Sequence, residues 1–225
     1  MKTIEEFLKN YDFNFLSEEV KVEEPYHNVW KEVYLPSQEK KSIENKLSED
    51  IKRRAFNGLS KRGKFLCDIY DYFECNNVAE VGTAEGFQLY TFCNHLKLKD
   101  KKCKVYSCDI RDARNKDYVG KFKEFEDFTL GTSKEMSEKI VKDDQKIDLF
   151  WIDGAHHTSS VINDVIRLSK TQSKNCIWLF DDFDERFGIY QELHYLSTFN
   201  EAHSLTLGPT ASGKPNNMML LKGMI

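Results

Sequence analysis

The sequence predicts an α/β fold in which a mostly parallel β-sheet is covered by helices on both faces. Apolar, strand-like runs alternate with helical patterns over residues 77–199, and such alternation is typical of right-handed βαβ units. One of these runs ends in a turn with two glycines, Gly82 and Gly86, and a helical pattern follows it. Two later runs end abruptly in aspartates. Strand ends of this kind indicate a ligand-binding edge of the sheet.

Composition narrows the function classes. The chain has 225 residues, 40% of them apolar and 31% charged, and a formal net charge of −4. This balance fits one α/β domain with an added N-terminal segment and provides no basic field for nucleic acid. No apolar run reaches membrane-spanning length, and the acidic N-terminus does not resemble a targeting peptide. The six cysteines form no C-x-x-C pair. We therefore expect a cytoplasmic protein with reduced thiols, without nucleic-acid or membrane partners.

The N-terminal segment is expected to be helical at its start and irregular from Pro25 to Tyr34. Two interpretations stay open for this irregular segment, namely a lid over a ligand pocket or an arm packed on the core. If it is a lid, its aromatic residues Tyr26, Trp30 and Tyr34 are expected to set substrate specificity. We assign residues 1–59 to this N-terminal extension and residues 60–225 to the main domain.

Two helices are expected between the extension and the sheet. Apolar residues recur every four positions from Ile43 to Ala55, which predicts the first helix. A break is predicted at Asn57-Gly58, and a second helix is predicted through Phe65 to Phe73.

The sheet is expected to have five parallel strands followed by a hairpin. The predicted strands cover residues 77–82, 104–109, 126–130, 147–152 and 176–180. The predicted helices between and after them cover residues 87–98, 133–142, 158–170 and 186–199. Two further strands, at 203–207 and 217–222, are joined by so short a link that they must be antiparallel.

The first predicted site binds a nucleoside. The turn reads Glu80-x-Gly82-x-x-x-Gly86, which differs from the G-x-G-x-x-G spacing of nicotinamide enzymes. Asp109 ends the next strand, where an acid lies beside the glycine turn and can accept both ribose hydroxyls. The alternative is that Asp109 only caps the turn that follows it. Residues 131–133 follow the third strand and are expected to contact the base of the nucleoside. The alternative is that Ser133 only caps the following helix.

The second predicted site is a cluster of carboxylates. Asp153 follows the fourth strand, and Asp181 and Asp182 follow the fifth. These ends converge at one edge of a parallel sheet, where three crowded carboxylates repel one another unless a cation is bound. Oxygen ligands favour Mg²⁺. The alternative is a solvated acidic loop.

A histidine close to these acids is a candidate base. His156 lies three residues after Asp153, close enough for the loop to return its side chain toward a bound substrate. Histidine is suited to removing a proton near neutral pH. The alternative is an exposed loop residue.

A phosphate-loop pattern near the end is expected to be accidental. Residues 208–214 fit G-x-x-x-x-G-K, but Pro215 stands where a Ser or Thr should bind Mg²⁺. A strand pattern follows instead of a helix. We expect a hairpin loop here.

Together these residues resemble the class I S-adenosylmethionine-dependent methyltransferases, whose Rossmann-like fold has a seven-stranded, mostly parallel sheet with an antiparallel last strand and helices on both faces. The resemblance covers Ser60 to the C-terminus. The sequence from Ile152 to His156 is most similar to that of the cation-dependent O-methyltransferases, in particular methyltransferase family 24. Two departures stand out: Thr158 where an aromatic is usual, and Lys174-Asn175 where Gly-Gly is usual.

The resemblance implies an O-methyltransferase that uses S-adenosylmethionine and Mg²⁺ or another divalent cation, with His156 as the catalytic base. It implies that Asp153, Asp181 and Asp182 hold the metal. The cofactor-binding residues that it implies are Glu80, Gly82, Thr83, Gly86, Asp109, Ile110, Thr132, Ser133 and Asp153. The expected substrate is a hydroxyl-bearing small molecule, such as a sugar, a diol or a catechol, and related enzymes are often homodimers. The alternatives are a metal-independent methyltransferase and a non-catalytic S-adenosylmethionine-binding protein.

Overall fold

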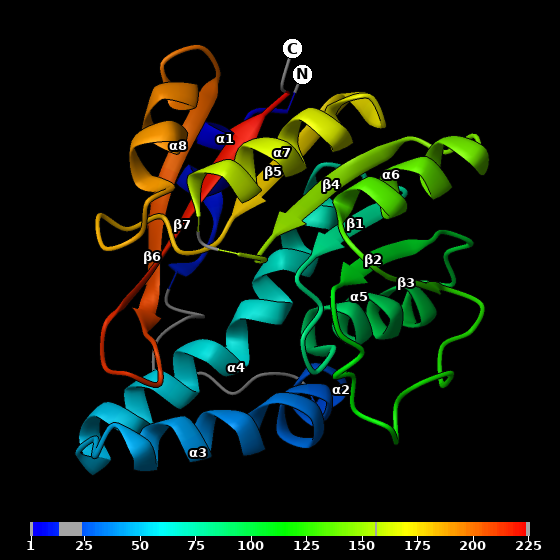
Figure 1. The fold of residues 1–225 in the computed structure, drawn as a ribbon. Helices are drawn as coiled ribbons and strands as arrows, with labels where there is room; N and C mark the ends of the chain where they lie inside the picture. Colours follow the sequence, from blue (N-terminus) through cyan, green and yellow to red (C-terminus); the bar gives the residue numbers. More distant parts are fainter. Residues whose placement is uncertain (1, 14–23, 156, 224–225) are drawn as a thin grey trace.

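A computed structural model describes residues 2–13, 24–155 and 157–223 of the chain. Its centre is a seven-stranded sheet with the order β3-β2-β1-β4-β5-β7-β6 (Figure 1). The first five strands run parallel, and β7 is antiparallel to both of its neighbours, β5 and β6. In chain order, the strands are β1 (Val78–Val81), β2 (Val105–Asp109), β3 (Glu126–Leu130), β4 (Ile147–Ile152), β5 (Gln172–Phe180), β6 (Glu201–Pro209) and β7 (Pro215–Lys222).

Helices cover both faces of this sheet. The helices are α1 (Ile4–Asn10), α2 (Glu24–Val29), the π-helix η2 (Trp30–Tyr34), α3 (Leu35–Glu44), α4 (Glu49–Tyr72), α5 (Phe87–Leu98), α6 (Ser133–Lys142), α7 (Thr158–Ser169) and α8 (Tyr190–Ser197). One core cluster joins the sheet to the N-terminal helices, α4 and α5, and a second cluster joins the other face to α6, α7 and α8. The predicted fold class is confirmed. Within the described ranges, no helix has the length and apolar character needed to cross a membrane.

The strands are buried because they lie between two helical layers. All four residues of β1 are buried, and β4 has burial at five of its six positions. A strand that is covered on both faces reads as a continuous apolar run, which explains why these two strands could be recognised in the sequence. At their carboxyl ends the backbone pairing continues past the strands: Asp153 N–H donates to Val81 O at 2.9 Å, and Asp181 N–H donates to Ile152 O at 3.0 Å.

The helix before the sheet differs from its prediction. The expected break at Asn57-Gly58 is wrong, because α4 continues from Glu49 to Tyr72 without interruption. Gly58 is buried within it, and tertiary packing outweighs the low helix propensity of these two residues. The chain turns earlier, where Lys46 has a φ of 51° and the Ser48 hydroxyl accepts from Ile51 N–H as the helix cap. The boundary drawn between residues 59 and 60 therefore falls inside α4.

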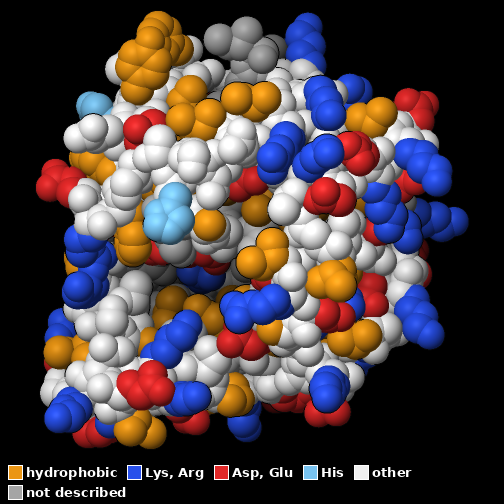
Figure 2. Space-filling model, in the orientation of Figure 1, with side chains coloured by type: hydrophobic (Ala, Val, Ile, Leu, Met, Phe, Trp, Pro, Cys, Tyr) orange, Lys and Arg blue, Asp and Glu red, His pale blue; other side chains and the backbone are white. Residues whose placement is uncertain are grey.

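Helices η2 and α3 lie beside the carboxyl ends of the parallel strands, whereas α1 packs at the other edge of the sheet, where Ile4 N–H donates to Glu201 at the start of β6 (Figure 1). Tyr26 and Trp30 are buried against the core, where the Tyr26 hydroxyl bonds to His95 Nδ1 at 2.7 Å. Tyr34 is only partly buried and stacks on Phe87, with ring centroids 4.9 Å apart. The irregular segment expected from Pro25 to Tyr34 is helical, and Tyr34 at its end lines a cavity. The face of the molecule drawn in Figure 2 is visibly hollowed.

The phosphate-loop pattern is the turn of the β6–β7 hairpin. Thr210 N–H bonds to Lys214 O, and Gly213 packs beside Leu47 and Ile51 of the N-terminal region. The sequence expectation of a hairpin here is confirmed.

Candidate functional site

The glycine turn after β1 is shaped by its neighbour on the sheet. Gly82 has a φ of 90°, and a Cβ there would lie 2.1 Å from the carbonyl oxygen of Asp153. No other residue fits this position without moving the backbone. The turn therefore brings the end of β1 directly against the loop that follows β4.

Asp109 connects this turn to the end of β2. Its Oδ2 accepts from Ala84 N–H at 2.9 Å, and its Oδ1 accepts from Arg111 N–H at 3.1 Å. The second bond is the turn cap that the alternative interpretation expects. The first fixes the carboxylate beside the glycine turn, and ribose binding by Asp109 stays a prediction.

A cavity of about 530 Å³ lies beside Asp109. Of the residues implied as cofactor ligands, those that line it are Gly82, Asp109, Ile110, Thr132, Ser133 and Asp153. Glu80, Thr83 and Gly86 do not line it. Thr83 is buried and donates to Cys108 O, whereas Gly86 begins α5 with a φ of 90°.

Glu80 is the buried acid of the turn. It is 1% exposed, and its Oε2 has no hydrogen-bond partner among the described residues. Burial raises the pKa of Glu80 to about 8, and the negative charge of Asp109 adds to this rise, whereas Arg62 and the Thr83 hydroxyl oppose it.

The third strand ends in a capped helix, but the cap is Thr132. Its hydroxyl accepts from Lys134 N–H, and Glu135 reaches back to Thr132 N–H in a capping box. The alternative interpretation, in which Ser133 only caps this helix, is wrong, because Ser133 is already its first residue. Its hydroxyl instead accepts from Arg167 Nη1 at 3.3 Å, which joins α6 to α7 beside the cavity.

The three predicted metal ligands come together. Asp153, Asp181 and Asp182 each offer a carboxylate oxygen, and these oxygens all lie within 4.8 Å of one another. Asp182 has a φ of 54°, a left-handed conformation that aspartate tolerates better than most residues and that recurs at functional sites. Asp184 is outside the cluster and pairs with Arg186.

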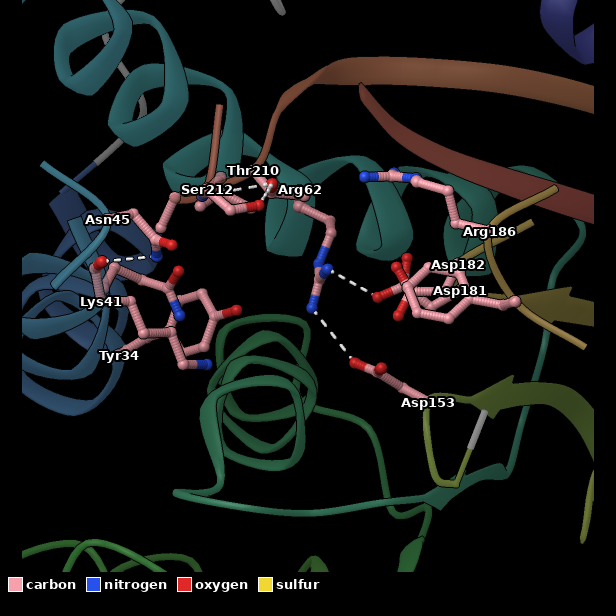
Figure 3. A pocket seen from close by; sticks show the side chains of 14 residues that line it. Tyr34, Lys41, Asn45, Arg62, Asp153, Asp181, Asp182, Arg186, Thr210 and Ser212 are labelled. Atoms are coloured by element: carbon pink, nitrogen blue, oxygen red, sulfur yellow. Dashed lines mark hydrogen bonds and ion pairs between the residues drawn. The ribbon is translucent and has the colours of Figure 1, made fainter. Parts of the chain in front are cut away.

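A buried arginine, which the sequence interpretation did not identify, lies among these acids. Arg62 of α4 donates from Nη1 to Asp181 Oδ2 at 2.9 Å and from Nη2 to Asp153 Oδ2 at 3.3 Å (Figure 3). Only 6% of its side chain is exposed, and its guanidinium lies 5.2 Å from the ring of Trp151. One cation thus links the acids of two neighbouring strands.

Burial and mutual repulsion control the charge of these acids. Burial raises the pKa of Asp153 well above its usual range; the charge of Asp181 adds to the rise, and Arg62 opposes it. Burial also raises the pKa of Asp181; Arg62 opposes this rise, and the charge of Asp182 adds to it. The pKa of Arg62 is also raised, because the acids more than offset its own burial.

A second cavity, of about 300 Å³, opens on the other side of the acids. It lies between the strand ends and the N-terminal helices, and its walls come from η2, α3, α4, the loop after β5 and the β6–β7 hairpin (Figure 3). Its lining residues are Tyr34, Gln38, Lys41, Asn45, Leu59, Arg62, Asp153, Asp181, Asp182, Arg186, Phe187, Thr210, Ala211 and Ser212. Of the three aromatics expected to set specificity, Tyr34 alone is among them.

His156, the predicted catalytic base, lies outside the described residues. Its neighbour His157 is exposed at the start of α7.

Comparison with known proteins finds a family match over the central part of the chain. A family model described as a methyltransferase domain, methyltransferase family 24, matches residues 79–183, which run from β1 through the acidic cluster. Over this range the chain matches a methyltransferase domain. The lining of the larger cavity lies entirely within the matched range, and the smaller cavity takes Asp153, Asp181 and Asp182 from it.

Solved structures share the fold over nearly the whole chain. An O-methyltransferase from Bacillus cereus in complex with SAH has 13% sequence identity and a TM-score of 0.61, and the match covers 94% of this chain and 96% of that one. TomG, an O-methyltransferase from Streptomyces achromogenes involved in tomaymycin synthesis and solved with SAM, has 12% identity and a TM-score of 0.61, with 95% and 96% covered.

A methyltransferase from Geobacter sulfurreducens has 13% identity and a TM-score of 0.57, with 94% and 95% covered. At these identities the likeness concerns the fold. No curated protein matches the sequence.

Proposed function

We propose that this methyltransferase transfers the methyl group of S-adenosylmethionine to a hydroxyl of a small molecule, with a divalent cation such as Mg²⁺ at its acidic cluster. The observation that carries the proposal is the position of Asp153, which lines both cavities. One cavity contains the glycine turn and Asp109, and the other contains the remaining acids. A methyl donor and a hydroxyl acceptor bound in these cavities would meet at Asp153.

The larger cavity fits a nucleoside cofactor. The acid at the end of β2 lies beside the glycine turn, as ribose recognition requires. Thr132 and Ser133, which follow β3, line the same cavity. Its volume of about 530 Å³ is in the range of small-molecule sites. The chain's own residues would bind the cofactor and fix the direction of its methyl group.

The acidic cluster fits a cation with oxygen ligands. Asp181 Oδ1 is buried and has no hydrogen-bond partner among the described residues, so a carboxylate oxygen is available there. Three carboxylates with one arginine also leave an excess of negative charge that a divalent cation would neutralise. When bound, such a cation supplies Lewis acidity that favours ionisation of a substrate hydroxyl.

His156 is the proposed base on sequence grounds. It follows Asp153 by three residues, and an imidazole can take the hydroxyl proton near neutral pH. A His156→Ala variant is expected to lose turnover while it keeps its affinity for S-adenosylhomocysteine. Wild-type turnover in this variant would remove His156 from the mechanism.

The test of the proposed function measures methyl transfer and binding separately. Purified protein is incubated with labelled S-adenosylmethionine and a panel of sugars, diols and catechols, first with Mg²⁺ and then with EDTA. Activity that vanishes in EDTA and returns with Mg²⁺ supports the proposal. Calorimetry with S-adenosylmethionine identifies the cofactor, and undetectable binding would refute the proposal.

One observation favours a metal-independent methyltransferase as the second candidate. Arg62 already binds both Asp153 and Asp181, so part of the negative charge is neutralised without a metal. In that case full activity would persist in EDTA, and cofactor binding would be unaffected by Mg²⁺.

A further inference from the structure

The smaller cavity has two ends of different character. The acids lie at one end, and residues from α3 and the β6–β7 hairpin form the other (Figure 3). The side chains at this second end are mostly polar: Gln38, Lys41, Asn45, Thr210 and Ser212. The reacting hydroxyl belongs at the acidic end if the proposed function holds. The other end then meets the part of the substrate that does not react.

Two of the three cations that line this cavity are already neutralised. Arg62 is held by Asp153 and Asp181. Arg186 donates from Nε and Nη2 to the two carboxylate oxygens of Asp184. Lys41 has no carboxylate partner among the described residues, and it lines the cavity from α3. Among the described residues that line the end of the cavity away from the acids, Lys41 is the one charged side chain.

A buried donor lies one helical turn before Lys41. Gln38 is 3% exposed, lines the same cavity, and its Nε2 has no hydrogen-bond partner among the described residues. A buried amide N–H costs free energy unless it finds an acceptor, and native proteins rarely leave one unpaired. Residues at positions i and i+3 lie on the same face of a helix. Gln38 and Lys41 can thus contact one group together.

The other side chains at this end of the cavity do not accept a hydrogen bond from Gln38 Nε2. The hydroxyls of Thr210 and Ser212 bond to each other at 2.7 Å across the hairpin loop. Tyr34 has one ring face on Phe87, so that face is closed to a substrate ring. The wall is suited to hydrogen bonding and charge more than to stacking.

We propose that the substrate carries an anionic group, a carboxylate or a phosphate, which Lys41 and Gln38 bind while the hydroxyl to be methylated lies at the acidic cluster. This inference rests on the proposed function and names the substrate class for it: hydroxylated acids or phosphate esters in place of neutral sugars and catechols. Lys41 supplies the charge, and Gln38 supplies a directed N–H donor.

The test compares matched probes that differ only in the anionic group. The pairs are D-glucuronate with D-glucose, D-glucose 6-phosphate with D-glucose, and 3,4-dihydroxybenzoate with catechol. Each is titrated calorimetrically into the protein with S-adenosylhomocysteine and Mg²⁺ present. In at least one pair, the anionic member is expected to bind roughly tenfold more tightly, as one charge-assisted hydrogen bond predicts. The carboxylate and phosphate arms distinguish the two sources.

Variants of residues on α3 test whether Lys41 and Gln38 cause the preference for the anionic probe. Lys41→Met is expected to abolish the preference for the anionic member, and Lys40→Met, at an exposed position that does not line the cavity, is the matched control and should retain it. Gln38→Glu places a carboxylate against the anionic group and should reverse the preference. Because Lys41 is exposed, its replacement does not threaten folding.

Binding and methyl transfer are separate readouts, so the two proposals fail in different ways. No preference in any pair, or a preference that persists in Lys41→Met, overturns the inference even if methyl transfer is observed. A preference that depends on Lys41, combined with no transfer to any hydroxyl, overturns the proposed function and leaves an anion-binding cavity.

Discussion

Arg62 Nη1 lies 2.9 Å from Asp181 Oδ2, and both side chains are more than nine-tenths buried. The pair joins the middle of α4 to the end of β5, two elements that are far apart in the sequence. Because Arg62 also reaches Asp153, it bridges the acids that follow β4 and β5. The acidic cluster is thus held together by a residue of the preceding helix.

Replacement of Arg62 should destabilise the protein. Arg62→Met leaves two buried acids without their cation, and breaking such a pair costs about 3–5 kcal/mol. The free energy of unfolding, measured by urea titration in EDTA, is expected to fall by about this amount. Addition of Mg²⁺ should recover part of the loss because it restores positive charge.

The matched control for this change is Arg54→Met. Arg54 lies on the same helix, but it is half-exposed and pairs with Asp50 at the surface. Its removal should cost about 0.5 kcal/mol or less. If Arg62→Met costs no more than the control, Arg62 does not hold the cluster together.

Asp182 is expected to bind the metal through one carboxylate oxygen. The side-chain amide oxygen of an asparagine could occupy the same position. Asp182→Ala removes the carboxylate oxygen and should weaken binding of Mg²⁺ or Mn²⁺ about tenfold or more, whereas Asp182→Asn keeps an oxygen ligand and should bind more tightly than the alanine variant. Calorimetric titration of the metal into cofactor-free protein measures both. Asp184→Ala is the control, because Asp184 pairs with Arg186 outside the cluster. Equal affinities in Asp182→Ala and wild type would contradict the assignment.

The positions of the acids could be predicted from the sequence because each acid follows a strand that its own apolar run identifies. The apolar run of β4 ends at Ile152 and that of β5 ends at Phe180, so the next residues had to lie at the same edge of a parallel sheet. The glycine turn and Asp109 were found by the same rule. These features depend on local pattern and on a topology with few alternatives.

Arg62 could not be found in this way. It lies in a polar stretch that contains Gly58 and Gly63, which favoured a helix break in the sequence interpretation, and its partners are about ninety or more residues further along the chain. Gln38 and Lys41 were missed for a related reason, since polar residues on a helix are usually solvated. Only the packing of α3 and α4 against the strand ends turns these side chains into the walls of a cavity.

Asp109 is expected to contribute to cofactor affinity. Asp109→Asn keeps the size of the side chain but removes the charge that would accept ribose hydroxyls. Affinity for S-adenosylhomocysteine should fall by about ten- to a hundredfold, the value of a hydrogen bond to a charged group. Asp112→Asn is the control, because Asp112 binds Arg114 and does not line the cavity. An unchanged affinity in Asp109→Asn would show that this acid only caps its turn.

Glu80 is expected to make folding stability depend on pH. Its ordinary pKa is 4.5, and burial raises its pKa in the folded protein to about 8. Between these values the folded state binds the proton more tightly than the unfolded chain. The stabilisation is fully present below about pH 4.5 and is lost as the pH rises to about 8, with a slope of up to about 1.4 kcal/mol per pH unit.

The Glu80→Gln variant isolates this effect, because glutamine mimics the protonated acid at every pH. Urea titrations of both proteins in EDTA, from pH 5 to pH 8, give the difference in their free energies of unfolding. The variant should gain stability relative to wild type as the pH rises. In the wild type, folding then requires Glu80 either to stay protonated or to be buried with a negative charge, and both cost free energy. Glutamine has neither cost. Glu138→Gln, at an exposed position of α6, controls for the substitution itself. A difference that stays constant over this range would mean that Glu80 is already ionised in the folded protein at pH 5.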